Sequence, residues 1–324
     1  EAGCAGSCVF TWQDEWFKRT WNTIPAVDLE NTPYWSDYQT NEQYFGLLTF
    51  EPGKEESVCY VDGNISEWGL EDMVMEGEGM TLSVKYDEKF IYFLVKKENF
   101  NQEKDTLFIP IDVTDKSGSV YCREYDVEFS RPCDFLIVIH GQKHSRVLVQ
   151  ERYEALRAAY GEEYYGTNPY QNPPEPDSPH FERIYLPLVL KEITAGRKAA
   201  GIKYETGQLR FGNADPKSED FDSLADFIFA GDYVEIRIPW QLINFSNPSR
   251  MMIHDDYYEN YGIENLHIEK MYVGAGCFEK EKYKIILEPV SLDGWGEKVS
   301  YHERLKKSYY ILQEYWTKRD NLPA

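Results

Sequence analysis

The chain has 324 residues, of which 42% are hydrophobic and 15% aromatic, and its formal net charge is −22 at pH 7. This hydrophobic content supports a sizeable core and argues against a wholly disordered chain. Because a strongly negative field repels phosphate groups, nucleic acid and anionic membrane surfaces are poor partners. The sequence also lacks the roughly 18 consecutive apolar residues of a membrane-spanning helix. We therefore expect no membrane span and an extracellular or cell-surface location.

The first segment, residues 7–12 (SCVFTW), is a short apolar run that predicts a buried strand. Residues 13–21 then mix acidic and aromatic side chains. A strand that ends in such a cluster resembles the last strand of the (β/α)8 barrel of glycoside hydrolases, whose C-terminal end faces the substrate. The resemblance implies that residues 1–54 are the end of an upstream barrel domain plus a linker, and that the parent protein is a glycoside hydrolase.

Two interpretations stay open for the acidic and aromatic residues of this segment. They line a sugar subsite of the upstream barrel, or they are solvated loop residues. The catalytic carboxylates of a retaining barrel enzyme lie on earlier strands, so no catalytic role is assigned here. The residues concerned are Trp12, Asp14, Glu15 and Trp16.

The centre of the chain predicts a β-hairpin. Residues 82–86 alternate apolar and polar side chains, and residues 90–95 form an apolar run rich in aromatic and β-branched residues. Residues 61–64 (VDGN) have turn chemistry, and Trp68 follows them closely. We expect the second strand to be buried on both faces.

This region carries a resemblance to a known family. The string VDGNISEW at 61–68, followed by YDEKFIYFLV at 86–95, resembles the opening of family 9-like carbohydrate-binding modules, which belong to the DOMON-like β-sandwich group. The string EIRIPW at 235–240 is similar to a strand near the end of these modules. The resemblance implies a mainly β chain in which residues 55–295 form an antiparallel β-sandwich that binds a glycan without catalysis.

Further apolar segments complete the predicted sandwich. Residues 146–160 begin like a strand and become helical, and residues 164–179 contain five prolines, which predicts a long surface loop. Pro187 interrupts its strand and predicts a sheet edge or a bulge. The remaining predicted strands are 105–113, 127–129, 135–139, 184–190, 206–216, 232–240, 267–273 and 284–287.

The predicted glycan site combines aromatic rings with planar polar groups. Rings beside turns or in the Pro-rich loop can stack on a sugar, and polar groups at the end of a strand can bond its hydroxyls. The ligand that we expect is a neutral glycan or oligosaccharide. The residues assigned to this site are Trp68, Tyr164, Tyr165, Arg210 and Asn213.

Acidic loops raise the possibility of bound calcium, which prefers several oxygen ligands. The candidate ligands are Asp112, Asp115 and Asp215, but they lack the regular spacing of an EF-hand loop, and an ordinary turn is the favoured interpretation. The six cysteines are too scattered for a zinc site, and they allow either one or two disulfides or free buried thiols.

The chain is expected to end in an amphipathic helix over 299–316, within a C-terminal segment that spans 296–324. Two alternative functions are also considered. The sandwich could be a structural accessory domain that stabilises the upstream barrel without binding sugar. It could also be a haem- or redox-binding DOMON domain, for which the available axial ligands are Met251, Met252 and His254.

Overall fold

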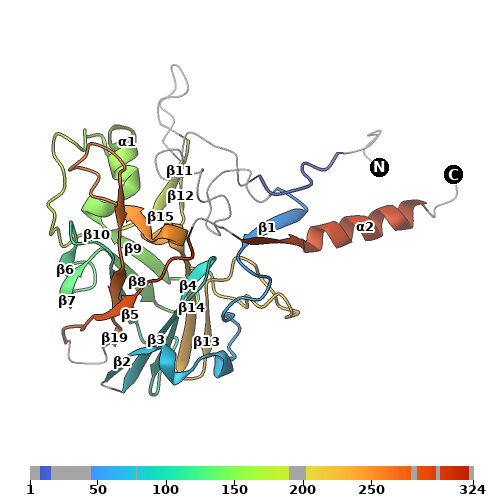
Figure 1. Ribbon diagram of the computed structural model, residues 1–324, viewed down its shortest axis with the longest axis horizontal. Coiled ribbons are helices and arrows are strands. Elements are labelled where there is room, and N and C mark those ends of the chain that lie inside the picture. Colours follow the sequence, from blue (N-terminus) through green and yellow to red (C-terminus); the bar gives the residue numbers. More distant parts are fainter. Residues whose placement is uncertain are drawn as a thin grey trace.

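The computed structural model describes residues 8–15, 45–77, 79–189, 202–278, 283–296 and 300–320. The chain is mainly β, with antiparallel sheets and a C-terminal helix (Figure 1). This confirms the predicted secondary-structure class. Trp16 lies outside the described residues, as does the first cysteine, Cys4.

The predicted hairpin forms the middle of a five-stranded sheet, and its strands pair antiparallel with Tyr86 opposite Ile91. The second strand of the hairpin is buried along most of its length, as expected. The strand that contains residues 235–239 of the EIRIPW string pairs with the other edge of this second hairpin strand. In spatial order the strands are β13 (Phe227–Ala230), β14 (Tyr233–Pro239), β4 (Phe90–Lys97), β3 (Met80–Tyr86) and β2 (Met73–Gly77).

A seven-stranded antiparallel sheet lies opposite. Its central strands, predicted from 105–113 and 135–139, are almost entirely apolar and buried. In spatial order the strands are β10 (Phe181–Arg183), β9 (Arg146–Gln150), β8 (Phe135–Ile139), β5 (Leu107–Asp112), β18 (Lys270–Val273) and β20 (Glu288–Ser291), and β19 (Gly276–Cys277) also pairs with β5.

The two sheets share one hydrophobic cluster. Alternate residues of each strand point inward, the pattern that a period of two requires. From the five-stranded sheet the cluster contains Leu82, Val84, Ile91, Phe93, Val95, Val234, Ile236 and Ile238. From the other sheet it contains Leu107, Ile109, Ile111, Phe135, Ile137, Ile139, Val147 and Val149.

Smaller elements cover the remaining surfaces. The hairpin of β6 (Ser119–Cys122) and β7 (Val127–Cys133) packs on the outer face of the seven-stranded sheet. Helix α1 (Ala155–Tyr165) follows β9, so the predicted change from strand to helix is confirmed. The other small sheets are β11 (Tyr185–Val189) with β12 (Ile202–Glu205), and β15 (Phe245–Asn247) with β16 (Met252–His254) and β17 (Asn265–His267). Short 3₁₀ helices span Ile65–Glu67, Leu70–Asp72, Glu151–Tyr153, Trp240–Ile243 and Pro248–Arg250.

The predicted C-terminal helix is wrong in its first half. Residues Tyr301–Leu305 form strand β21, which pairs antiparallel with β1 (Leu48–Pro52), and only Lys307–Asp320 form helix α2. Tyr301 and Leu305 belong to the apolar spacing that suggested a helix. They lie in a strand because β1 supplies hydrogen-bonding partners for the backbone of residues 301–305. We call the β1–β21 pair the terminal ribbon; it lies beside the large sheets, and α2 continues outward from it (Figure 1).

Two predicted strands and one loop boundary also need correction. Residues 206–216 make only isolated bridges. At the end of this segment, Asn213 and Asp215 accept hydrogen bonds from backbone amides two residues ahead, which favours turns there. Residues 284–287 contribute an isolated bridge instead of a strand. The Pro-rich loop starts after α1, which extends to Tyr165 and ends where Gly166 adopts a φ of 74°. The bulge expected at Pro187 is confirmed.

The N-terminal apolar run does not form the predicted buried strand. Phe10 and Trp12 are more than half exposed, and Gln13 makes a single bridge to Leu48. The described part of this apolar run therefore lies at the surface. Its apolar character alone was not sufficient to predict a buried strand.

The family-like strings contact one another. Glu235 of EIRIPW accepts hydrogen bonds from the backbone amide of Gly63 at 2.7 Å and from the Trp68 indole at 3.1 Å, both in VDGNISEW. Trp240 donates its indole hydrogen to the carbonyl of Asp87, at the tip of the hairpin, at 2.8 Å. These side chains therefore fix the turns against the outer face and edge of the five-stranded sheet.

Candidate functional site

A cleft of about 650 Å³ lies between the terminal ribbon and the five-stranded sheet. The ribbon supplies one wall, residues 55–60 and 214–224 supply others, and the beginning of β4 and the side chain of Arg237 on β14 complete it. These segments lie far apart in the sequence. The terminal ribbon therefore creates the cleft by bringing residues near both ends of the chain against the sheet.

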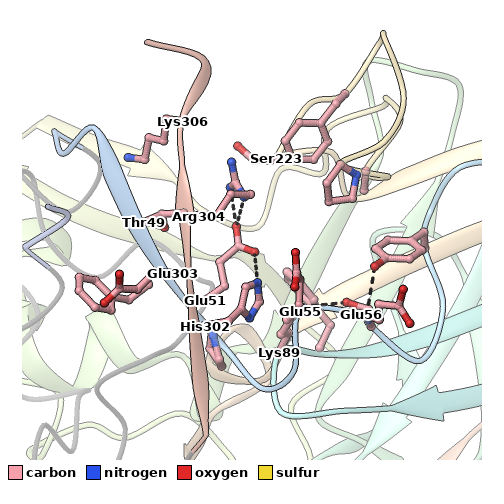
Figure 2. Close-up of a pocket in the computed structure, with 18 of the residues that line it drawn as sticks. Thr49, Glu51, Glu55, Glu56, Lys89, Ser223, His302, Glu303, Arg304 and Lys306 are labelled. Carbon is pink, nitrogen blue, oxygen red and sulfur yellow. Dashed lines mark hydrogen bonds and ion pairs between the residues drawn. The ribbon is translucent and has the colours of Figure 1, made fainter. Parts of the chain in front are cut away.

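Glu51 is the centre of the ribbon wall (Figure 2). Its carboxylate accepts a hydrogen bond from Nε of Arg304 at 2.9 Å, and its other oxygen is 3.1 Å from Nε2 of His302. Burial opposes the charge of Glu51, but the His302 and Arg304 contacts outweigh it and lower its pKa to about 2. Glu51 is thus a fixed anion that fastens β1 to β21.

Asp14 has a similar structural role at the same end of the cleft. Its buried carboxylate accepts hydrogen bonds from the backbone amide of Gly46 and from Lys306. Burial raises the pKa of Asp14, although Lys306 acts in the opposite direction. Of the other residues assigned to a barrel subsite, Trp12 packs edge-on against Tyr309 of α2, and Glu15 is half-buried.

Two cations reach the cleft, Lys89 from the turn before β4 and Arg237 from β14. Arg237 donates to the carbonyls of Ala225 at 2.7 Å and Ser223 at 2.8 Å, and its guanidinium lies 4.4 Å from the centre of the Phe90 ring. Lys89 donates to the hydroxyl of Ser57 at 3.0 Å. Both residues are buried, and burial lowers the pKa of Lys89.

Aromatic rings line the opposite walls. Tyr60 and Phe221 are half-buried, and the guanidinium of Arg304 lies 5.3 Å from the Phe221 ring centre. The mouth carries the exposed carboxylates of Glu55, Glu56 and Glu303. The cleft therefore combines flat apolar faces with many hydrogen-bonding groups.

Apart from Asp14, which was assigned to a barrel sugar subsite, these cleft residues were not identified as a site from the sequence. Arg237 could have been noticed as a charged residue within a strongly apolar strand sequence, whereas Lys89 lies in the polar turn before such a sequence. Glu51 carries no comparable signal, because its partners lie more than 250 positions away.

Trp68, the first residue of the predicted glycan site, packs on the outer face of the five-stranded sheet with Cys59, Phe90 and Tyr92. Its indole N–H is directed to Glu235. Trp68 is half-buried and outside the lining of the cleft.

The other four predicted residues fall into two separate places. Tyr164 and Tyr165 lie at the end of α1, where Lys203 sits 5.6 Å and 5.3 Å from their ring centres. Arg210 forms an ion pair with Asp222 at 3.3 Å, and Asn213 holds the following turn. The contacts described for these residues thus connect them to different neighbours and do not assemble one site.

The calcium candidates are similarly dispersed. Asp112 forms a 2.8 Å ion pair with Arg131, Asp115 is exposed, and Asp215 accepts the amide of Lys217. Within the described ranges, no group of three or more His, Cys, Asp or Glu side chains is placed to hold a metal ion. The described cysteines are free thiols: Cys8, Cys59, Cys122, Cys133 and Cys277.

Comparison with protein-family models, with curated proteins and with solved structures finds no match for this chain. Among the residues that the structure describes, no helix has the length and apolar character needed to cross a membrane.

Proposed function

We propose that this chain is a non-catalytic carbohydrate-binding module whose two large sheets form a β-sandwich of the DOMON-like, family 9-like type. The observation that carries the proposal is the cleft, which is large enough for a sugar unit and combines aromatic faces with fixed polar groups. Protein sites for small ligands have this combination of an apolar lining with a few placed hydrogen-bonding groups. The contacts between the family-like strings support the same conclusion.

In this proposal Tyr60 and Phe221 provide the rings on which the C–H faces of a sugar stack. The carboxylates of Glu55 and Glu56 at the mouth accept hydrogen bonds from sugar hydroxyls. The site therefore differs from the one predicted from the sequence, in which Trp68, Tyr164 and Tyr165 supplied the aromatic rings. The module would act within a larger glycoside-hydrolase-like protein, as the N-terminal resemblance implies.

The test is binding of a panel of neutral and acidic oligosaccharides, measured by isothermal titration calorimetry. Stacking on an aromatic ring contributes about 1 kcal/mol beyond area burial, so Tyr60→Ala or Phe221→Ala should weaken binding roughly fivefold. Tyr261→Ala is the matched control, because that ring is 78% exposed and does not line the cleft. Absence of binding to every sugar would refute the proposal.

The structural accessory role is the second candidate, and one observation favours it. Apolar side chains are exposed around α2 and the N-terminal segment: Phe10, Trp12, Phe45, Tyr310 and Ile311 are each more than half exposed. Such a surface suits contact with a neighbouring domain. A module with this role alone would bind no glycan in the calorimetric panel.

The haem alternative has less support. Met251 and His254 are buried in the shared core, and Nδ1 of His254 is 2.7 Å from the hydroxyl of Tyr257. Core packing therefore accounts for both residues. An absorption spectrum of the purified protein with added haemin tests this alternative directly.

A further inference from the structure

The cleft has an uneven distribution of charge. Its exposed mouth carries carboxylates, but the turn before β4 and strand β14 contribute the cations Lys89 and Arg237. Both are buried: Lys89 is 8% exposed and Arg237 9%. Interactions of buried charges are screened less by solvent than those of exposed charges. Two buried cations therefore contribute to the cleft lining, whereas the anion Glu51 in the same lining is already paired with Arg304.

In the described part of the chain, these two cations have no ion-pair partner. Among the described residues, no carboxylate oxygen lies within 4.0 Å of either cationic group. The two cations instead contact a hydroxyl, two carbonyls and an aromatic ring. A buried cation that is not paired is costly, so proteins normally supply it with an anion.

The nearest carboxylates are already engaged elsewhere. Asp87 accepts the backbone amides of Lys89 and Phe90 and the hydroxyl of Tyr92. Asp226 accepts the backbone amide of Arg210 at 2.7 Å, and Glu51 holds the terminal ribbon together. These acids moderate the positive field without forming a direct pair with Lys89 or Arg237.

We propose that the glycan bound in the cleft is acidic, and that the carboxylate of a uronic acid unit binds between Lys89 and Arg237. This inference rests on the proposed function, and it changes the expected ligand from a neutral to an anionic sugar. Arg237 retains Nη1 without a hydrogen-bonding partner in the described structure, and the Lys89 ammonium has two hydrogens beyond the one given to Ser57. A carboxylate can accept from both groups, since its two oxygens present several lone pairs.

The experiment compares three ligands by calorimetry at constant ionic strength: sodium glucuronate, glucuronamide and sodium acetate. Glucuronamide has nearly the same shape as glucuronate but no charge, and acetate has the charge but no sugar ring. We expect glucuronate to bind at least about tenfold more tightly than either, because hydrogen bonds to charged groups are the stronger ones.

Three variants locate the effect. Lys89→Gln should reduce the preference for glucuronate over glucuronamide to about twofold or less. Lys89→Arg keeps the positive charge and should therefore retain the preference of the wild type. Lys284→Gln should leave the preference unchanged, because Lys284 is exposed and does not line the cleft. Thermal unfolding of each variant establishes that it is folded before binding is measured.

The possible failures are distinguishable. Equal affinity for glucuronate and glucuronamide would overturn the acidic-sugar inference and leave glycan binding intact. Equal affinity for acetate and glucuronate would identify a general anion site and overturn the sugar assignment. A Lys89→Gln variant that keeps the full preference would also overturn the inference. Absence of binding by all three ligands and by every neutral and acidic oligosaccharide of the panel would overturn both proposals.

Discussion

The ion-pair network of Glu51 predicts a pH-dependent contribution to stability. We consider Glu51→Gln, which keeps the size of the side chain and removes its charge. In the folded protein the pKa of Glu51 is about 2, against an ordinary value of 4.5. This difference corresponds to about 3 kcal/mol of unfolding free energy at neutral pH. Because a quarter of the side chain is exposed, solvent screening makes this an upper limit, and we expect about 1–3 kcal/mol.

The sign of the pH dependence follows from the lowered pKa. The stabilisation is complete above the pKa of the unfolded state and is lost as the pH falls from about 5 towards 2. Urea unfolding at pH 7 and pH 3 should therefore show a large difference between wild type and Glu51→Gln at pH 7 that shrinks at pH 3. Glu303→Gln is the control, since Glu303 lies on the same ribbon but is exposed. A wild-type advantage that is the same at both pH values, or no advantage at pH 7, would refute the reasoning.

Three other predictions concern the core, the thiols and metal binding. Ile109→Ala opens a cavity in the cluster shared by the sheets, so the unfolding free energy measured with urea should fall by about 2–5 kcal/mol; a change below 1 kcal/mol would contradict the shared core. Cys8 is exposed and should react with a thiol reagent in the native protein, whereas the buried Cys59 should react only after unfolding, as mass spectrometry of labelled peptides can show. Because Asp112 is paired with Arg131, a chelator and millimolar calcium should give the same melting temperature; a rise with calcium would restore the metal hypothesis.

Those parts of the fold that depend on local pattern were predictable from the sequence. The hairpin over 82–95 and the strand over 232–240 have alternating or continuously apolar sequences, which are typical of half-buried and fully buried strands. Their predicted inward residues, such as Ile236, do lie in the core. Periodicity succeeds here because each strand meets the same hydrophobic layer along its whole length.

The candidate site was not predictable in the same way, because distant pairs create it. The sequence of residues 48–52 does not indicate that they pair with residues 301–305, and a helix was therefore predicted for residues 301–305. Trp68 was expected to be an open platform because it follows a turn, but Glu235 accepts its indole hydrogen from 167 positions away. Local turn chemistry at Asn213 likewise prevented the strand that its neighbours suggested.

The terminal ribbon also has a consequence for the order in which the molecule is assembled. Closing a contact across some 250 residues costs more chain entropy than closing a local hairpin, and contacts of long sequence separation form slowly. The two large sheets, by contrast, contain the local hairpin β3–β4 and carry the shared core without the ribbon. We therefore expect a refolding chain to acquire its core first and its ligand affinity later. A shortened chain that starts near residue 55 should still fold cooperatively, but it would lack β1 and with it one wall of the cleft.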